Sequence, residues 1–205
     1  MLTIMTTAAT LVYDIGNHRY LNITARCTLR CQFCPKHNGS KQIHEYDLSL
    51  SKRITADDII PLLGDVKKVD EYVFCGFGEP TLNLECLLQV AHAIKAQGGR
   101  VRLNTDGLGN HFHRRNILPD LSQCVDSLSI SLNADTEQSY EQHCRPKLAG
   151  SYQALLEFIQ QAPQFIPDVQ VSAINGLANV DMARCRAIAE QHGAIFKQRE
   201  LDKLG

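Results

Sequence analysis

The sequence predicts an α/β fold in which a parallel sheet forms an open, partial (β/α)6 barrel. Short apolar runs alternate along the chain with segments of helical periodicity, which makes about six β-α units. This alternation favours right-handed crossovers between parallel strands, and six units are too few to close an eight-unit barrel. No repeat, low-complexity run or linker interrupts the 205 residues, so residues 1–205 are expected to form a single domain.

Each predicted element follows from its own pattern of residues. Strands are expected at residues 20–25, 71–75, 100–104, 126–133, 168–174 and 194–199. Helices are expected from residue 55, from residue 84 to the glycines at 98 and 99, and at residues 113–121, 136–143, 151–161 and 181–192. Thr55 is the expected N-cap of the first helix, whose apolar face would consist of Ile59, Leu62 and Leu63. In such folds the chemistry lies in the loops at the carboxyl ends of the strands.

The composition is that of an ordinary globular protein, with 44% apolar and 21% charged residues. Lys and Arg number 21 and Asp and Glu 22, and this net charge of −1 favours neither nucleic acid nor a membrane surface as a partner. No run approaches the roughly 20 apolar residues that span a bilayer, and the N-terminus lacks the pattern of a secretory signal. These features predict a cytoplasmic protein.

Eight cysteines in a compartment that keeps thiols reduced indicate metal binding or catalysis before disulfides. Five of them stand singly among apolar residues: Cys75, Cys86, Cys124, Cys144 and Cys185. Because a free cysteine behaves as a small hydrophobic residue, we expect most of these five in the core.

The other three, Cys27, Cys31 and Cys34, form a C-x3-C-x2-C run in the loop after the first predicted strand. Three thiolates this close in sequence can hold three corners of one four-iron cluster, which normally has a fourth ligand. One iron would then be open to another molecule. The alternative is a structural zinc site completed by His37 or His44, although zinc signatures usually contain two cysteine pairs.

Glycines and an acid follow the second predicted strand, in the segment at residues 75–82. Gly76 and Gly78 would let the backbone approach a ligand closely, and Glu79 could accept hydrogen bonds from a cationic amine. The alternative is a tight strand-to-helix turn with a solvated acid, since glycine-rich turns are common.

The next two predicted strands also end in polar residues. Asn104 and Asp106 suit the two hydroxyls of a ribose, with a plain Asp-Gly turn as the alternative. Ser131 and Asn133 lie at the end of the fourth strand, where alternating polar residues are otherwise typical of a solvated face. Because each of these loops follows a successive strand, all of them are expected to face the same pocket.

The C-x3-C-x2-C run, with Phe33 just before its last cysteine, resembles the signature of the radical S-adenosylmethionine (SAM) superfamily. The resemblance implies a TIM-like partial barrel with one 4Fe–4S cluster on the three cysteines. It also implies that the amino and carboxylate groups of SAM chelate the open iron. One electron from the reduced cluster then cleaves SAM, and the 5′-deoxyadenosyl radical takes a hydrogen atom from a substrate.

The loops carry the same resemblance. Residues 76–80 are similar to the superfamily's Gly-Gly-Glu-Pro motif, with Phe77 in place of the first glycine of the pair. That motif implies that the backbone at Gly76 and Gly78 and the acid of Glu79 hold the SAM amino group. The stretch 104–107 is similar to an Asn-Thr-Asn-Gly motif beside the SAM ribose, which assigns this place to Asn104 and Asp106. The resemblance places Ser131 and Asn133 near the SAM ribose or carboxylate.

Within the superfamily, the stretches at residues 22–27, 76–81, 103–110, 131–134 and 144–146 resemble the short proteins associated with TatD-type hydrolases. The similarity runs from about residue 20 to residue 199. It implies possible association with such a hydrolase and an electron donor such as flavodoxin or ferredoxin. The substrate would be a small molecule, or a glycine in a partner protein as in activases. A non-catalytic zinc or iron–sulfur module that serves binding or electron transfer is the alternative from another class.

Two basic residues are candidates for substrate contact. Lys36 opens a long polar connection at residues 36–53, and such connections over a pocket often act as lids. Most of its side chains would otherwise form a solvated face. Arg145 could clamp a carboxylate or phosphate, with a surface ion pair as the alternative. No downstream C-x2-C pair is present, so no second cluster is expected.

Overall fold

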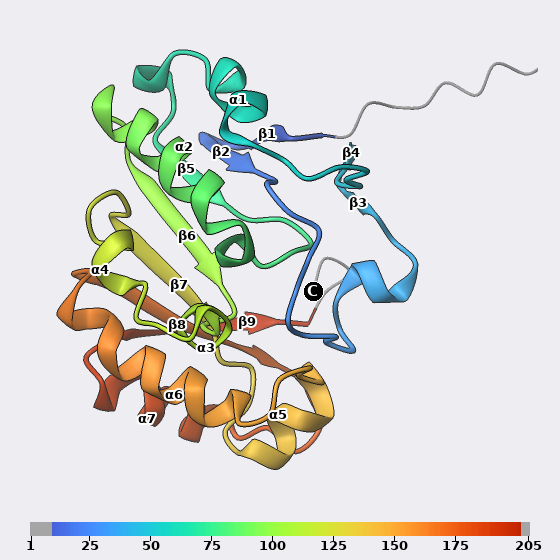
Figure 1. The fold of residues 1–205 in the computed structure, drawn as a ribbon. Helices are drawn as coiled ribbons and strands as arrows, with labels where there is room; N and C mark the ends of the chain where they lie inside the picture. Colours follow the sequence, from blue (N-terminus) through green and yellow to red (C-terminus); the bar gives the residue numbers. More distant parts are fainter. Residues whose placement is uncertain (1–9, 202–205) are drawn as a thin grey trace, which may run out of the picture.

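The computed structural model describes residues 10–201, which form a curved sheet with helices on its outer side (Figure 1). In their order across the sheet, the strands are β1 (Val12–Ile15), β2 (His18–Leu21), β5 (Glu71–Phe74), β6 (Val101–Thr105), β7 (Ser127–Ser131), β8 (Asp168–Asn175) and β9 (Ile195–Glu200). Strands β2 to β9 of this sheet are parallel, whereas β1 is antiparallel to β2. The predicted α/β class with a parallel sheet is confirmed, and β1 is a strand that the sequence pattern did not indicate.

Helices connect the parallel strands. The α-helices are α1 (Ala56–Ile59), α2 (Leu84–Ala96), α3 (Gly109–His113), α4 (Leu118–Leu121), α5 (Glu137–Cys144), α6 (Ser151–Gln161) and α7 (Met182–Gln191). Short 3₁₀ helices lie at Pro35–Asn38, Ile60–Leu62, Val66–Lys68, Pro80–Asn83 and Ala162–Gln164. Two short strands, β3 (Gln42–Ile43) and β4 (Tyr46–Asp47), pair as a separate hairpin. None of the helices within residues 10–201 is long and apolar enough to cross a membrane.

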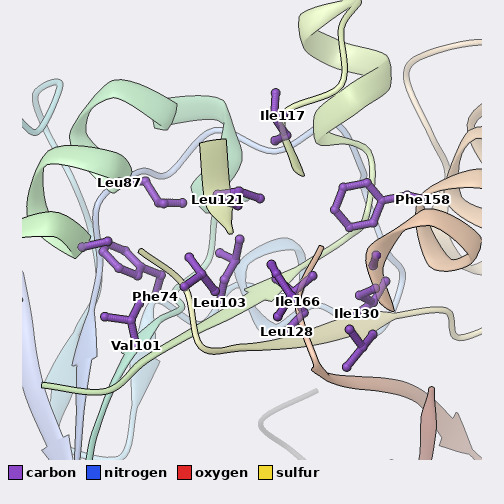
Figure 2. Packing of buried hydrophobic residues seen from close by; sticks show 14 of the residues in the cluster. Phe74, Leu87, Val101, Leu103, Ile117, Leu121, Leu128, Ile130, Phe158 and Ile166 are labelled. Atoms are coloured by element: carbon purple, nitrogen blue, oxygen red, sulfur yellow. The ribbon is translucent and has the colours of Figure 1, made fainter. Parts of the chain in front are cut away.

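The hydrophobic core lies between the sheet and the helices, as the close view in Figure 2 shows. Side chains alternate along β6, because successive residues of a strand point to opposite faces of the sheet. Val101 and Leu103 are fully buried against the helices, whereas Arg102 and Asn104 are partly exposed on the other face. The hydrophobic core therefore covers the outer face of the sheet, and the polar side chains of the strands line the inside of the barrel.

The single cysteines mostly belong to this core. Cys86, Cys124, Cys144 and Cys185 are buried, as predicted for small apolar residues. Cys75, which directly follows β5, is partly exposed and is not one of these buried core cysteines.

The first parallel strand is shorter than the sequence pattern predicts. A strand is expected at residues 20–25, but β2 ends at Leu21. The Asn22 side chain donates hydrogen bonds to the carbonyls of Thr10 at 3.0 Å and Leu48 at 3.1 Å. These bonds tie Asn22 to other segments, and the chain leaves the sheet at this residue.

Two predicted helices are interrupted by prolines. The single helix expected at residues 113–121 is wrong: α3 ends at His113, Arg114 has a φ of 54°, and Pro119 stands in the first turn of α4. Proline has no N–H to donate, so it is tolerated at the start of a helix but not in its interior. For the same reason α1 ends at Ile59 and continues only as a 3₁₀ turn that contains Pro61.

Because α1 is shorter than predicted, its predicted apolar face is wrong at one position. Thr55 is its N-cap as predicted, and Ile59 and Leu63 are buried. Leu62, however, is 49% exposed, because the tighter 3₁₀ turn points it away from the core.

The neighbouring leucines provide a matched test of this packing. Leu63→Ala is expected to lower the free energy of unfolding by about 2–5 kcal/mol, since it removes buried methyl groups and leaves a cavity. Leu62→Ala is expected to change it by less than about 0.5 kcal/mol. Urea denaturation of both variants measures the difference, and equal losses at the two positions would contradict the assignment of the buried side chain.

Candidate functional site

The clustered cysteines lie in the loop that follows β2 at the carboxyl edge of the sheet. Cys27, Cys31 and Cys34 are free thiols and are half-buried. The backbone N–H of Leu29 donates to Cys27 Sγ at 3.4 Å, and the N–H of Cys34 donates to the Cys31 carbonyl at 3.2 Å. The loop therefore folds back on itself, with at least one backbone donor already directed at a cysteine sulfur.

The carboxyl end of α5 holds one side of this loop. The backbone N–H of Arg30 donates to the Cys144 carbonyl at 3.0 Å, and that of Gln32 donates to the His143 carbonyl at 2.9 Å. The His143 ring lies 2.6 Å from the carbonyl of Ala178 through Nε2, so this nitrogen must carry the proton. Its Nδ1 is then the acceptor for the Gln32 side-chain amide. Backbone and side-chain contacts thus fix the loop against α5.

Glu79 holds together the next two loops of the carboxyl edge. Its side chain is 3% exposed. Oε1 accepts hydrogen bonds from the Thr81 N–H at 3.0 Å, the Thr81 hydroxyl at 2.7 Å and the Thr105 hydroxyl at 2.8 Å. Oε2 accepts the Asp106 N–H at 2.6 Å. Three of these donors share Oε1 and only one reaches Oε2, so Glu79 is a buried, hydrogen-bonded acid whose Oε2 has room for one further donor.

Asp106 continues this network to the cysteine loop. Its Oδ2 accepts the Thr28 hydroxyl at 2.7 Å and lies 3.9 Å from Cys27 Sγ, while Oδ1 accepts the Leu108 N–H at 2.9 Å. Burial raises the pKa of both Asp106 and Glu79 above the ordinary range for a carboxyl group. The predicted ribose ligand Asp106 therefore also joins β6 to the loop with the three cysteines.

The surroundings of the clustered cysteines favour the protonated thiols. Burial raises the pKa of Cys27 and of Cys34. The pKa of Cys31 is raised chiefly by a hydrogen bond with the Cys144 thiol and also by burial. Because a metal takes thiolates, loading this loop must release protons.

The predicted glycines lie close to this chain's own backbone. A Cβ at Gly78 would come within 2.1 Å of the Thr24 carbonyl oxygen and 2.7 Å of that of Arg26. A Cβ at Gly76 would stand 2.5 Å from the side-chain oxygen of Asn22. The close approach that these glycines permit is therefore made to the segment leading into the cysteine loop, and their contact with a ligand stays a prediction.

Unpartnered amide oxygens occur at the carboxyl edge. Asn104, near the end of β6, and Asn133, just after β7, each have a buried Oδ1 without a hydrogen-bond partner in residues 10–201. Asn133 is 4% exposed and has a φ of 55°, and Ser131 ends β7 two residues earlier. Asn22, at the end of β2, has the same kind of unpartnered oxygen, although the sequence analysis did not select it as a site residue.

The remaining candidates differ in their surroundings. Phe33 packs partly against the core, and the Lys36 amino group donates to the carbonyl of Ala25. Arg145 is exposed with a φ of 49° and lines a cavity of about 290 Å³ between α5 and the start of α6. Lys147, which borders the same cavity, donates to the Cys27 carbonyl at 2.8 Å. The cavity therefore adjoins the cysteine loop.

The histidines of the zinc alternative do not join the cysteines. His37 and His44 are both exposed. Across residues 10–201, no three His, Cys, Asp or Glu side chains lie close enough to hold a single metal ion, and this includes Cys27, Cys31 and Cys34. Tyr140 and Thr28, by contrast, lie near the cysteine loop but were missed, because an isolated tyrosine or threonine carries no recognisable motif.

Asp106→Asn tests the buried carboxyl pair through the pH dependence of stability in the metal-free protein. A raised folded-state pKa contributes stability that is present below the unfolded pKa and is lost as the pH rises through the folded value. Wild type is therefore expected to lose stability between about pH 5 and pH 8, and the variant, which lacks this carboxyl group, is expected to lose less over the same range, whatever its absolute stability. Urea denaturation at the two pH values measures the difference.

Asp58→Asn is the control for this comparison. The pKa of Asp58 is lowered to about 2, chiefly by its hydrogen bond with Lys52, so its titration falls below that pH window. If the free energy of unfolding changed with pH in the same way for wild type and Asp106→Asn, burial would not raise the pKa of this carboxyl pair, and the interpretation would be wrong.

Several solved structures have a similar fold. A radical SAM methyltransferase from Sphaerobacter thermophilus matches with a TM-score of 0.60 at 13% identity, over 92% of this chain and 68% of that one. Streptococcus suis SuiB bound to precursor peptide SuiA matches with a TM-score of 0.66 at 12% identity, over 88% and 38%. Methylornithine synthase matches with a TM-score of 0.60 at 13% identity, over 92% and 55%. The fold is thus similar to the TIM-like partial barrels of these proteins.

Two sequence comparisons also find matches. A segment of 91 residues is 30% identical to a tungsten-containing aldehyde ferredoxin oxidoreductase cofactor-modifying protein of Pyrococcus furiosus. The match spans 43% of this chain and 23% of that protein, less than a quarter of its length. The model of the radical SAM superfamily matches residues 21–191, which include all three clustered cysteines. The chain therefore belongs to the radical SAM superfamily.

Proposed function

We propose that this chain is a radical SAM enzyme that holds one 4Fe–4S cluster on Cys27, Cys31 and Cys34. Members of the superfamily use SAM and an iron–sulfur cluster. The observation that carries the proposal is that these cysteines share one loop at the carboxyl edge of the sheet, inside the segment that matches the family. In this proposal residues 1–205 act as a single domain.

The donor set fits such a cluster. Cysteine thiolates are the usual ligands of iron–sulfur clusters, and backbone N–H groups directed at their sulfurs tune them. The loop supplies three thiols, and the Leu29 N–H is already directed at Cys27 Sγ. Three protein ligands leave one iron for SAM, which is the arrangement that the resemblance implies.

The carboxyl edge also fits SAM. Buried oxygens without donors are costly, and a ligand with N–H or O–H groups relieves this cost. The unpartnered oxygens of Asn104 and Asn133 suit the ammonium group and the ribose hydroxyls of SAM. Ser131 and the backbone at Gly76 and Gly78 are proposed to complete this pocket.

Glu79 is proposed both to contact SAM and to position this pocket. Three of its four protein donors share Oε1, whereas Oε2 accepts only the Asp106 N–H and keeps an acceptor position for the SAM amine. Glu79 is also proposed to fix the position of the loop at residues 76–78 relative to the end of β6. Asp106 is proposed to lie by the ribose while it fixes the cysteine loop through Thr28.

When bound, the reduced cluster supplies one electron that cleaves SAM, and the 5′-deoxyadenosyl radical abstracts hydrogen from the substrate. The contacts of the cysteine loop with α5 and with β6 orient the cluster and limit water around it. Phe33 is proposed to pack beside the cluster from within the loop. The electron would come from a donor such as flavodoxin or ferredoxin.

Both substrate classes, a small molecule and a partner protein, have support among the structural relatives. SuiB binds a precursor peptide, which supports a protein substrate, and methylornithine synthase supports a small one. Arg145 on the cavity beside the cysteine loop is proposed to contact an anionic group of the substrate. Lys36, held by the Ala25 carbonyl, is proposed to close the pocket from the connecting segment. Association with a TatD-type hydrolase belongs to the same proposal and rests on the sequence resemblance.

The cysteine loop is tested first through metal content. Cys31→Ala is expected to abolish cluster assembly after anaerobic reconstitution with iron and sulfide, because one of three corner ligands is lost. Cys124→Ala, which removes a buried core cysteine, is the matched control and should retain the cluster. Iron analysis and the visible iron–sulfur absorption give the readout. A full cluster in the Cys31 variant would overturn the ligand assignment.

Turnover is tested by formation of 5′-deoxyadenosine after SAM and dithionite are added to the loaded protein. Production is expected for wild type and for Cys124→Ala, and not for Cys31→Ala. A loaded wild-type cluster that never yields 5′-deoxyadenosine would favour the binding or electron-transfer module. Zinc in place of iron would overturn the proposal.

A further inference from the structure

The Tyr140 hydroxyl is a buried donor without an acceptor. Tyr140 lies on α5 and is 0% exposed, and its hydroxyl has no hydrogen-bond partner within the part of the chain that the structure describes. Buried polar groups in native proteins are almost always paired, and an unpaired one retains its full desolvation penalty. A missing partner at this position therefore points to a bound group.

The face of α5 that carries Tyr140 points to the cysteine loop. Cys144 follows one helical turn later on the same face, and its thiol hydrogen-bonds to Cys31. The Cys144 carbonyl accepts the Arg30 N–H from the same loop. Burial raises the pKa of the Tyr140 phenol, and Cys144, Asp106, Cys31 and Cys27 raise it further, which agrees with a position of Tyr140 on the side of α5 that meets the cysteine loop.

Protein groups near this hydroxyl do not provide the acceptor. Asp106 acts on the phenol electrostatically, but its oxygens, which accept from Thr28 and Leu108, are not hydrogen-bond partners of the Tyr140 hydroxyl. The nearest aromatic neighbour, Tyr152, contacts Tyr140 ring to ring at a centroid distance of 5.5 Å. Burial raises the pKa of the Tyr140 phenol above its ordinary value, so the hydroxyl stays a donor at neutral pH.

We infer that the Tyr140 hydroxyl donates a hydrogen bond to a sulfur atom of the cluster, on the side held by Cys31. This inference rests on the proposed function, since the cluster supplies the acceptor. Reduction adds negative charge to the cluster, and a hydrogen bond to its sulfur stabilises the reduced form more than the oxidised form. Tyr140 would thus make it easier to load the electron that cleaves SAM.

Tyr140→Phe tests this directly, because it removes one oxygen and keeps the ring. Wild type and variant are reconstituted with iron and sulfide without air, matched for iron content, and titrated potentiometrically with electron paramagnetic resonance as the readout. The variant is expected to have an equilibrium constant for reduction about tenfold lower, equal to a midpoint about 59 mV more negative for one electron.

Tyr152→Phe is the matched control. It removes the same atom from the adjoining ring, whose hydroxyl interacts with Cys185, Asp135 and Glu137 and not with the cysteine loop. Its midpoint potential is expected to equal that of wild type. An equal shift in both variants, or no shift in Tyr140→Phe, would overturn the inference.

A second readout follows from stability. In the metal-free protein, Tyr140→Phe is expected to melt no lower than wild type, because the lost hydroxyl has no partner there. In the loaded protein the same variant is expected to melt below wild type, because a hydrogen bond is lost. A lower melting temperature in the metal-free variant would show that the hydroxyl is paired within the chain and would contradict the inference.

These outcomes separate the two proposals. If wild type never assembles a 4Fe–4S cluster, the proposed function and the role of Tyr140 both fall. If the cluster assembles on the three cysteines and the Tyr140→Phe potential equals that of wild type, only the role of Tyr140 falls.

Discussion

The site depends on the buried carboxylate of Glu79 more than on any other single group. Its hydrogen bonds join the loop after β5 to the end of β6, through Thr81, Thr105 and the backbone of Asp106. Asp106 then reaches Thr28 in the cysteine loop. Three consecutive loops at the carboxyl edge are thereby held by one continuous network. Because burial disfavours charge in both carboxyl groups, this order is costly and is maintained only while every donor remains in place.

The cysteine loop is held from two sides, and this has consequences for its chemistry. The carboxyl network supports it from β6, while the end of α5 supports it through Cys144 and His143. A loop fixed in this way presents its thiols with little freedom to rearrange, which favours a cluster in one orientation. The same helix face contributes the Tyr140 phenol, so one short helix both positions the loop and supplies a hydrogen-bond donor.

The superfamily match and the geometry of the site support the same function, although they depend on different residues. The superfamily match spans residues 21–191 and includes the cysteine run. The geometry adds the unpartnered oxygens of Asn104 near the end of β6 and Asn133 just after the adjacent β7, which are the acceptors proposed for SAM. It also assigns Asp106, which stands at an asparagine position of the motif, a second role in holding the cysteine loop.

The sequence by itself determined the alternation of strands and helices, because apolar periodicity is local and α2, α6 and α7 need no distant partner to be recognised. It also determined the cysteine run, whose spacing is a property of the chain. Only the tertiary structure decided that Glu79 is buried and hydrogen-bonded, since Thr105, one of its donors, is distant in sequence. The exposure of Leu62 follows from the local 3₁₀ turn at Pro61, which the helical periodicity alone did not indicate. The tertiary structure likewise brought the end of α5 to the cysteine loop, because contacts between residues far apart in sequence depend on how the sheet arranges α5 and the loop after β2.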